Sequence, residues 1–151
     1  MDLAGEFSHH AEIHRQCRRA GGRRHRHGLD RIHAPAFEVA IRGVGAFDDG
    51  RRARLLYAAI EPSPALSDLE ARVGAALARV PGVELETRRF VPHVTLARLK
   101  DPDRNRLGAF LEGNGTLGTP PWTADCFALY SSATGNEQPV YTLEERFELG
   151  L

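Results

Sequence analysis

The most informative stretch of the 151 residues is RFVPHVTLARL, residues 89–99. Its apolar and polar side chains alternate, which predicts a β-strand. Pro92 has no backbone N–H to donate to a neighbouring strand, so we expect it at the start of the strand or on a sheet edge. A period of two residues directs Val94 and Leu96 toward the core and leaves the other face of the strand to polar side chains.

His93 and Thr95 share that polar face, because they are two residues apart. An imidazole can take a proton from water, or give one to a leaving oxygen, near neutral pH. Thr95 can hydrogen-bond a phosphoryl oxygen, and Arg98 supplies a permanent positive charge for a phosphorane-like transition state. Strict alternation places Arg98 on the opposite face, so the strand must twist or bulge near Ala97 to bring the three together. The pattern also fits a half-exposed strand histidine with no chemical role.

Turn and periodicity signals on either side predict the remaining elements. Apolar residues recur every three to four positions after residue 64, which predicts a helix with one buried stripe, formed by Leu66, Leu69, Val73, Leu77 and Val80. The expected elements are strands at 37–47 and 54–60, a helix from 62–64 to 81, the strand at 89–99, a helix at 102–111 and strands at 122–132 and 140–149. Most strands are joined by turns too short for parallel crossovers, so the fold class is α+β with a largely antiparallel sheet.

Composition sets the broad class of protein. A length of 151 residues favours one core, and 20 basic against 20 acidic residues give no net charge. No apolar run approaches the roughly 20 residues of a membrane span, so we expect a soluble protein without a membrane partner. Two cysteines, Cys17 and Cys126, are too few for a disulfide framework, which favours the reducing cytoplasm.

The first 33 residues differ in composition from the rest. They hold seven Arg, four acidic residues and six of the seven His, so we expect an atypical segment at 1–33 and a domain at 34–151. Ser8 could cap a helix at 9–19, and the following RRAGGRRHRHG is interpreted as a solvated loop. His10 and His14 have the spacing of metal ligands on a helix, but no cysteine completes a site, and a solvated surface is preferred to a metal site. The arginines could instead contact an RNA backbone.

Four stretches resemble the 2H phosphoesterase superfamily, most of all its bacterial RNA 2',3'-cyclic phosphodiesterases of the 2'-5' RNA ligase type. They are PAFEVAIRGVGAF, LLYAAIEPSPAL, FVPHVTLARLK and FALYSSATGNEQPVYTLEERFEL. The resemblance implies a two-lobed α+β fold with flanking helices, in which each lobe places one His-x-Thr or His-x-Ser on a central strand. It also implies hydrolysis of a terminal 2',3'-cyclic phosphate of RNA to a 2'-phosphate, without metal, ATP or other cofactor.

By the same resemblance His93 is the second-motif histidine and acts as the base toward water, with Thr95 and Arg98 as phosphate contacts. Arg89, just before the strand, is a further candidate phosphate contact by its position, although an exposed arginine with no such role is the commoner explanation at a strand start. Tyr130 in the last predicted hairpin could stack on a base, or it could serve only to pack the sheet.

The sequence contains no other His-x-Thr or His-x-Ser. The opening DLAGEF resembles the end of the strand that carries the family's first motif. This resemblance implies that the first His-x-Thr motif, its strand and the preceding helix are missing from the 151 residues. A truncated gene, a misplaced start codon or a frame disturbance at 15–30 would explain it. We therefore expect impaired hydrolysis, and the alternative is a non-catalytic remnant that binds the 3'-end of RNA or a nucleotide. No protein partner is expected, and the intact protein is expected to be a monomer.

Overall fold

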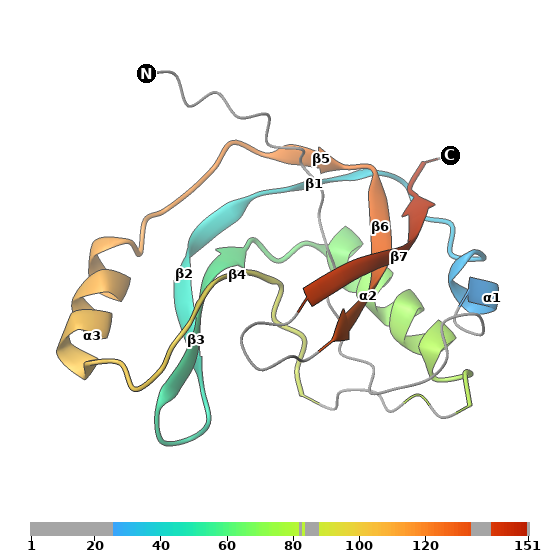
Figure 1. The fold of residues 1–151 in the computed structure, drawn as a ribbon. Coiled ribbons are helices and arrows are strands. Elements are labelled where there is room, and N and C mark those ends of the chain that lie inside the picture. Colours follow the sequence, from blue (N-terminus) through green and yellow to red (C-terminus); the bar gives the residue numbers. More distant parts are fainter. Residues whose placement is uncertain (1–25, 82, 84–87, 134–139, 151) are drawn as a thin grey trace, which may run out of the picture. The chain divides into compact units, whose positions relative to one another are not determined.

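The computed structural model describes residues 26–81, 83, 88–133 and 140–150 (Figure 1). The expected helix at 9–19 lies outside the described residues. In chain order the elements are α1 (Arg26–Leu29), β1 (Phe37–Val39), β2 (Ile41–Asp48), β3 (Ala53–Ile60), α2 (Pro64–Leu77), β4 (His93–Arg98), α3 (Arg104–Gly113), β5 (Trp122–Ala124), β6 (Cys126–Ala133) and β7 (Val140–Glu148). β2–β3, β3–β4 and β6–β7 all pair antiparallel, so the predicted α+β class is confirmed.

The chain divides into two compact units, in agreement with the expected two-lobed fold. The first unit comprises Met1–Phe37, Pro64–Arg88 and Thr123–Leu151, and the second comprises Glu38–Ser63 and Arg89–Trp122. The predicted boundary between an atypical segment at 1–33 and a domain at 34–151 was drawn from composition, and it stays a prediction. Among the described residues, no helix is both long and apolar enough to cross a membrane.

The core of the first unit lies between α2 and the β6–β7 hairpin. Leu66, Leu69, Val73 and Leu77 of the predicted stripe are buried, with Leu69 only 1% exposed. The fifth member, Val80, lies beyond the end of α2 and is half-buried. Leu69, Val73 and Leu77 form one cluster with residues from outside the helix, namely Leu29 and Ala34 before β1, Phe127 of β6 and Leu149 just after β7. Phe127 and Phe147 stack on neighbouring strands with ring centroids 4.8 Å apart. Apolar periodicity therefore predicted this helix and its buried face correctly, although the helix ends at Leu77 and not at Pro81.

Residues 26–29 form a helical turn, α1, where the sequence indicated a solvated loop. Leu29 joins the core of the first unit and is 3% exposed. Gly28 lies against α2 so closely that a Cβ at this position would stand 3.6 Å from the Cβ of Ala76. The expectation of a loop was wrong because packing against α2 stabilises a turn whose own sequence shows no periodicity.

The second unit is built on a sheet with strand order β2-β3-β4, in which the three strands lie side by side (Figure 1). The predicted turn between β2 and β3 is present, and Gly50 adopts the left-handed region with φ of 84°. Pro92 immediately precedes β4, as its missing N–H requires. α3 begins where the Asp103 side chain accepts a hydrogen bond from Arg106 N at 2.8 Å, a standard N-cap.

Val94 and Leu96 are exposed, so the expectation that they point into the core was wrong. Their exposed fractions are 45% and 49%. They alternate with polar positions as predicted, but α3, the helix described in this unit, buries none of its own residues. It supplies no apolar layer over β4, and strand periodicity alone cannot reveal whether such a layer exists.

Candidate active site

The imidazole of His93 is held by the backbone just before β4. Its Nδ1 lies 2.7 Å from the carbonyl oxygen of Val91. A carbonyl oxygen can only accept a hydrogen bond, so Nδ1 must carry the proton and donate. In the neutral ring the lone pair is then on Nε2, the nitrogen that remains available for a substrate or water. His93 itself is half-buried.

Two aromatic rings from neighbouring strands pack against this imidazole. Phe47 of β2 and Tyr57 of β3 stack on each other with centroids 4.4 Å apart. Each then meets the His93 ring edge-on, at 4.9 Å from Phe47 and 5.4 Å from Tyr57. The Val91 hydrogen bond and the two rings thus restrain the orientation of the imidazole from two directions.

Gly45 makes room for this arrangement. A Cβ at Gly45 would lie 2.8 Å from Cε2 of Tyr57 and closer still to Cζ and the hydroxyl oxygen. The Tyr57 ring therefore leans over the bare backbone of β2, where only glycine fits without a shift. Sequence reasoning missed all three of these residues. The available signal was that Gly45 and Phe47 are two residues apart and so share a face of one predicted strand, while Tyr57 lies on the next strand. This signal becomes informative only once the hairpin register, which pairs Gly45 with Tyr57, is known.

β4 contains a bulge between the predicted phosphate contacts. Tyr57 pairs with Thr95, whereas the preceding residue, Leu56, pairs with Ala97. Leu96 is therefore an extra residue with no direct partner on β3, which is the arrangement of a β-bulge. The bulge falls next to Ala97, the position at which the sequence predicted a twist or bulge if Arg98 was to share a face with His93.

The bulge places Arg98 on the same face of the sheet as His93. Arg98 pairs with Leu55, and Thr95 pairs with Tyr57. Leu55 and Tyr57 are two residues apart and share a face, and paired residues of antiparallel strands also share a face. The side chains of His93, Thr95 and Arg98 thus belong to one face, with Thr95 and Arg98 exposed.

The two remaining predicted contacts occupy different elements. Arg89 is exposed and lies in the second unit, four residues before β4 begins. Tyr130 is half-buried in β6 of the first unit, where it pairs with Leu143. Both assignments stay predictions. The histidine and arginine cluster at 9–25 lies outside the described residues, and within the described ranges no group of His, Cys, Asp and Glu could hold a metal ion.

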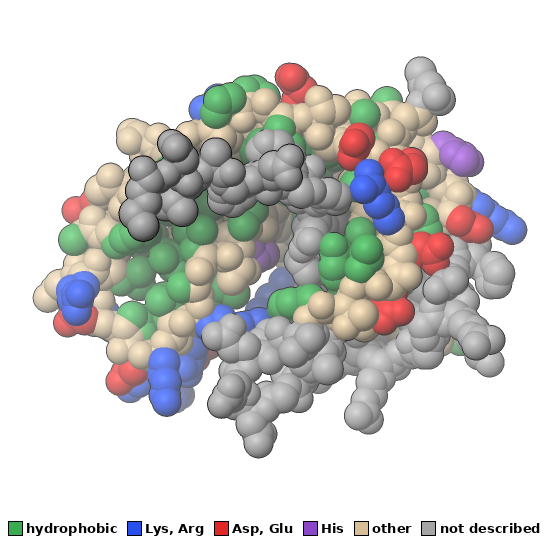
Figure 2. Space-filling model, turned by 45° about the horizontal axis from the view of Figure 1, so that its top comes forward, with side chains coloured by type: hydrophobic (Ala, Val, Ile, Leu, Met, Phe, Trp, Pro, Cys, Tyr) green, Lys and Arg blue, Asp and Glu red, His purple; other side chains and the backbone are tan. Residues whose placement is uncertain are grey.

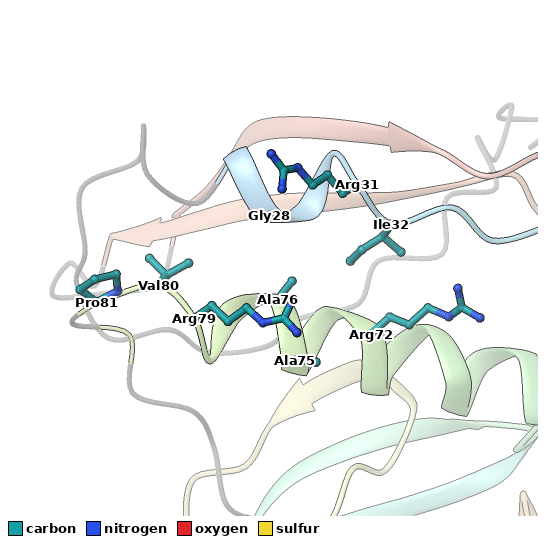
Figure 3. Close-up of a pocket in the computed structure, with 9 residues that line it drawn as sticks. All are labelled: Gly28, Arg31, Ile32, Arg72, Ala75, Ala76, Arg79, Val80 and Pro81. Atoms are coloured by element: carbon teal, nitrogen blue, oxygen red, sulfur yellow. The ribbon is translucent and has the colours of Figure 1, made fainter.

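A cavity of about 460 Å³ lies elsewhere, in the first unit between α1 and α2 (Figure 3). Arg31, Arg72 and Arg79 contribute to its lining. Arg72 is already engaged, since its Nε bonds Asp68 Oδ2 at 2.8 Å and its Nη1 bonds the His33 carbonyl at 3.1 Å. None of the predicted site residues lines this cavity.

The β4 face carries three groups that are able to act together on a phosphate ester. An imidazole with an available Nε2 can exchange a proton, a hydroxyl can bond a phosphoryl oxygen, and a guanidinium can stabilise added negative charge. These three groups are suited to the chemistry of phosphate esters, and they are carried on an antiparallel sheet of an α+β fold.

Comparison with known proteins agrees with that chemistry. The sequence profile of the 2'-5' RNA ligase superfamily matches residues 4–136. The chain belongs to the 2'-5' RNA ligase superfamily. This confirms the resemblance drawn from its sequence.

Curated relatives carry the name RNA 2',3'-cyclic phosphodiesterase. The chain is 32% identical over 115 residues to one from Aquifex aeolicus, covering 76% of this chain and 61% of the relative. It is 33% identical over 130 residues to one from Thermus thermophilus, covering 82% of this chain and 60% of the relative. The chain therefore spans about three fifths of the length of these relatives.

Solved structures share the fold. The crystal structure of TT0787 of Thermus thermophilus is similar with a TM-score of 0.53 at 31% identity, over 80% of this chain and 63% of that one. LigT of E. coli in its apo form is similar with a TM-score of 0.60 at 21% identity, over 85% of this chain and 67% of that one.

Proposed function

We propose that this chain hydrolyses the terminal 2',3'-cyclic phosphate of RNA to a 2'-phosphate. The family and the names of the relatives at 32% and 33% identity support this reaction. The observation that carries the proposal is the β4 face, where His93 Nδ1 donates to Val91 and Nε2 stays available beside Thr95 and Arg98.

In the proposed reaction His93 acts as the general base. Nε2 takes a proton from water while the water oxygen forms a bond to phosphorus. The bond between phosphorus and the 3'-oxygen breaks, and the phosphate stays on the 2'-oxygen. Thr95 bonds a non-bridging phosphoryl oxygen, and Arg98 stabilises the extra negative charge of the transition state. Arg89 is a further phosphate contact, and Tyr130 stacks on a base.

The departing 3'-oxygen also needs a proton. In the family resemblance the histidine of the first His-x-Thr motif donates it, and residues 1–151 contain only the motif at His93. A general acid contributes about 10²- to 10⁴-fold in rate, so we expect turnover of these 151 residues to be slower by that factor than with both motifs.

The test is hydrolysis of a 2',3'-cyclic mononucleotide, with the 2'-phosphate product identified by chromatography and a chelator present to remove metal ions. His93→Ala should abolish turnover. The matched control is His33→Ala, because His33 is exposed in the first unit and only its backbone carbonyl makes a described bond. Unchanged turnover in His93→Ala would overturn the assignment.

The alternative, a binding remnant, predicts a different pair of results. The chain would bind a 2'-phosphate or cyclic-phosphate end, lose that binding in Arg98→Gln, and show no His93-dependent turnover. The presence of one His-x-Thr motif in the 151 residues is the observation that favours this alternative.

A further inference from the structure

We propose that the tip of the β2–β3 hairpin and the loop after β4 bind the phosphate backbone of the single-stranded RNA whose end is processed at His93. We call residues 48–54 and 98–106 the basic tip. This inference rests on the proposed function and extends it to the body of the RNA. Figure 2 shows Lys and Arg side chains beside Asp and Glu side chains at the lower left, over this hairpin and α3.

The basic tip concentrates the positive charge of the second unit. It holds seven basic and four acidic residues, for a formal charge of +3. The rest of that unit holds two basic and three acidic residues. The basic members of the tip are Arg51, Arg52, Arg54, Arg98, Lys100, Arg104 and Arg106.

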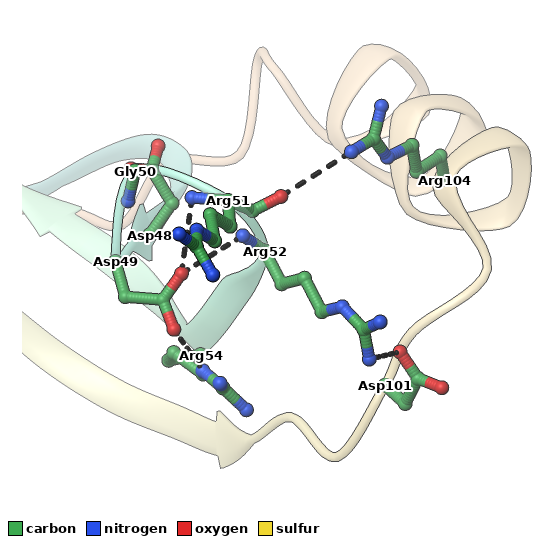
Figure 4. Close-up of polar contacts among 8 residues, drawn as sticks. All are labelled: Asp48, Asp49, Gly50, Arg51, Arg52, Arg54, Asp101 and Arg104. Atoms are coloured by element: carbon green, nitrogen blue, oxygen red, sulfur yellow. Dashed lines mark hydrogen bonds and ion pairs between the residues drawn. The ribbon is translucent and has the colours of Figure 1, made fainter.

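The carboxylate of Asp49 is occupied in shaping the turn (Figure 4). Oδ1 accepts the N–H groups of Arg51 and Arg52 at 3.0 and 2.9 Å, and Oδ2 accepts Arg54 Nε at 2.6 Å. The Arg52 N–H, the Arg54 guanidinium and the Arg51 N–H together lower the pKa of Asp49 from 3.8 to about 2. This acid therefore stays ionised and directed at the loop rather than at a ligand.

The other acids of the basic tip are also engaged locally. Asp48 Oδ1 accepts the Gly50 N–H at 2.8 Å, and Asp103 caps α3. Asp101 forms an ion pair with Arg52, which ties the hairpin to the loop after β4. Asp48, Asp49 and Asp103 thus fix the backbone of the tip. Within the described residues, Asp49 and Asp101 pair with Arg54 and Arg52 and with none of the tip's other cations.

Several cations of the basic tip remain available for a ligand. The side chains of Arg51, Lys100 and Arg106 are exposed, and within the described part of the chain they form no ion pair or hydrogen bond. Arg104 Nη2 donates to the Arg51 carbonyl at 3.2 Å, so the hairpin and α3 are held together before any ligand binds. A preorganised group of cations loses little conformational entropy on binding a polyanion.

The register puts the basic tip in line with His93. His93 pairs with Ala59 and Arg98 with Leu55, which separates them by four residues of β3, or about 13 Å. The turn lies beyond the start of β3, so a path from His93 to the turn is roughly 20 Å long. A stacked strand carries one phosphate about every 3.4 Å along its axis. An RNA held at its 3'-end by His93 and Arg98 could therefore reach the tip with several upstream phosphates.

The test compares two double variants by fluorescence anisotropy with a labelled single-stranded RNA that ends in a 2'-phosphate. Arg51→Gln with Lys100→Gln removes two charges from the basic tip. The control, Arg31→Gln with Arg79→Gln, removes two exposed arginines beside the cavity of the first unit. Each lost phosphate contact lowers the slope of log K against log salt by about 0.7, so the tip variant should bind about 25-fold more weakly near 0.1 M salt.

We expect the RNA affinity of the tip variant to fall by about 25-fold and that of the control to change by less than about twofold. The melting temperature should be unchanged in both variants. A 2'-mononucleotide held at His93 and Arg98 is too short to reach Arg51 or Lys100, so its affinity should not change in the tip variant. Equal weakening in the two double variants, or an unchanged salt slope in the tip variant, would overturn the inference. Hydrolysis of a cyclic mononucleotide is scored separately. Its absence alongside tip-dependent RNA binding would count against the proposed function and not against the tip.

Discussion

Substitution of Gly45 by alanine tests the aromatic cluster around His93. The added Cβ would lie 2.8 Å from Tyr57 Cε2, and ordinary contact begins at 3.4 Å, so the ring has to move by at least about 0.6 Å. The ring is stacked on Phe47 at 4.4 Å and meets His93 at 5.4 Å, so any shift is passed to one of them. Overpacking of this kind costs about 1–3 kcal/mol.

The assay is urea unfolding combined with turnover of a cyclic mononucleotide. Gly45→Ala should lose about 1–3 kcal/mol in the free energy of unfolding and about tenfold or more in turnover, because small displacements of a catalytic group are costly. Gly108→Ala is the control, since no atom lies within 4 Å of a Cβ on that helix, and alanine there should stabilise by up to about 1 kcal/mol.

A double-mutant cycle decides whether the Tyr57 ring is the cause. The φ of Gly45 is not in the left-handed region, so nothing in its backbone opposes alanine. In a Tyr57→Ala background, Gly45→Ala should be neutral or stabilising by about 0.5 kcal/mol, because alanine in a strand loses less entropy on folding than glycine. An equal loss of stability in both backgrounds would refute the reasoning.

Two further predictions concern stability. The pKa of Asp49 is lowered from 3.8 to about 2 on folding, so its charge stabilises the protein above pH 3.8 and that contribution is lost as the pH falls through about 2. Urea unfolding should therefore show wild type more stable than Asp49→Asn at neutral pH, with the difference vanishing near pH 2, and a constant difference would contradict this. Leu69→Ala, at a side chain 1% exposed, should cost about 2–5 kcal/mol, whereas Leu96→Ala, at 49% exposed, should cost less than about 1 kcal/mol. Similar costs at the two leucines would show that β4 is covered on that face.

Local signals in the sequence determined much of this protein. The alternation around His93 predicted β4, Pro92 marked its start, and the leucine stripe predicted α2 and its buried face. These features depend on residues within a few positions of one another, through backbone sterics and side-chain period. The family also followed from the sequence alone, since the motif at His93 survives as a contiguous stretch.

The tertiary structure decided what surrounds that motif. The bulge at Leu96 turns Arg98 to the face of His93, and the hairpin register brings Tyr57 over Gly45 and against the imidazole. Register is set by pairing between residues distant in sequence, so no local period reveals it. The helical turn at 26–29 and the exposure of Val94 have the same origin, because the presence or absence of a packing partner is a property of the folded chain and not of the segment.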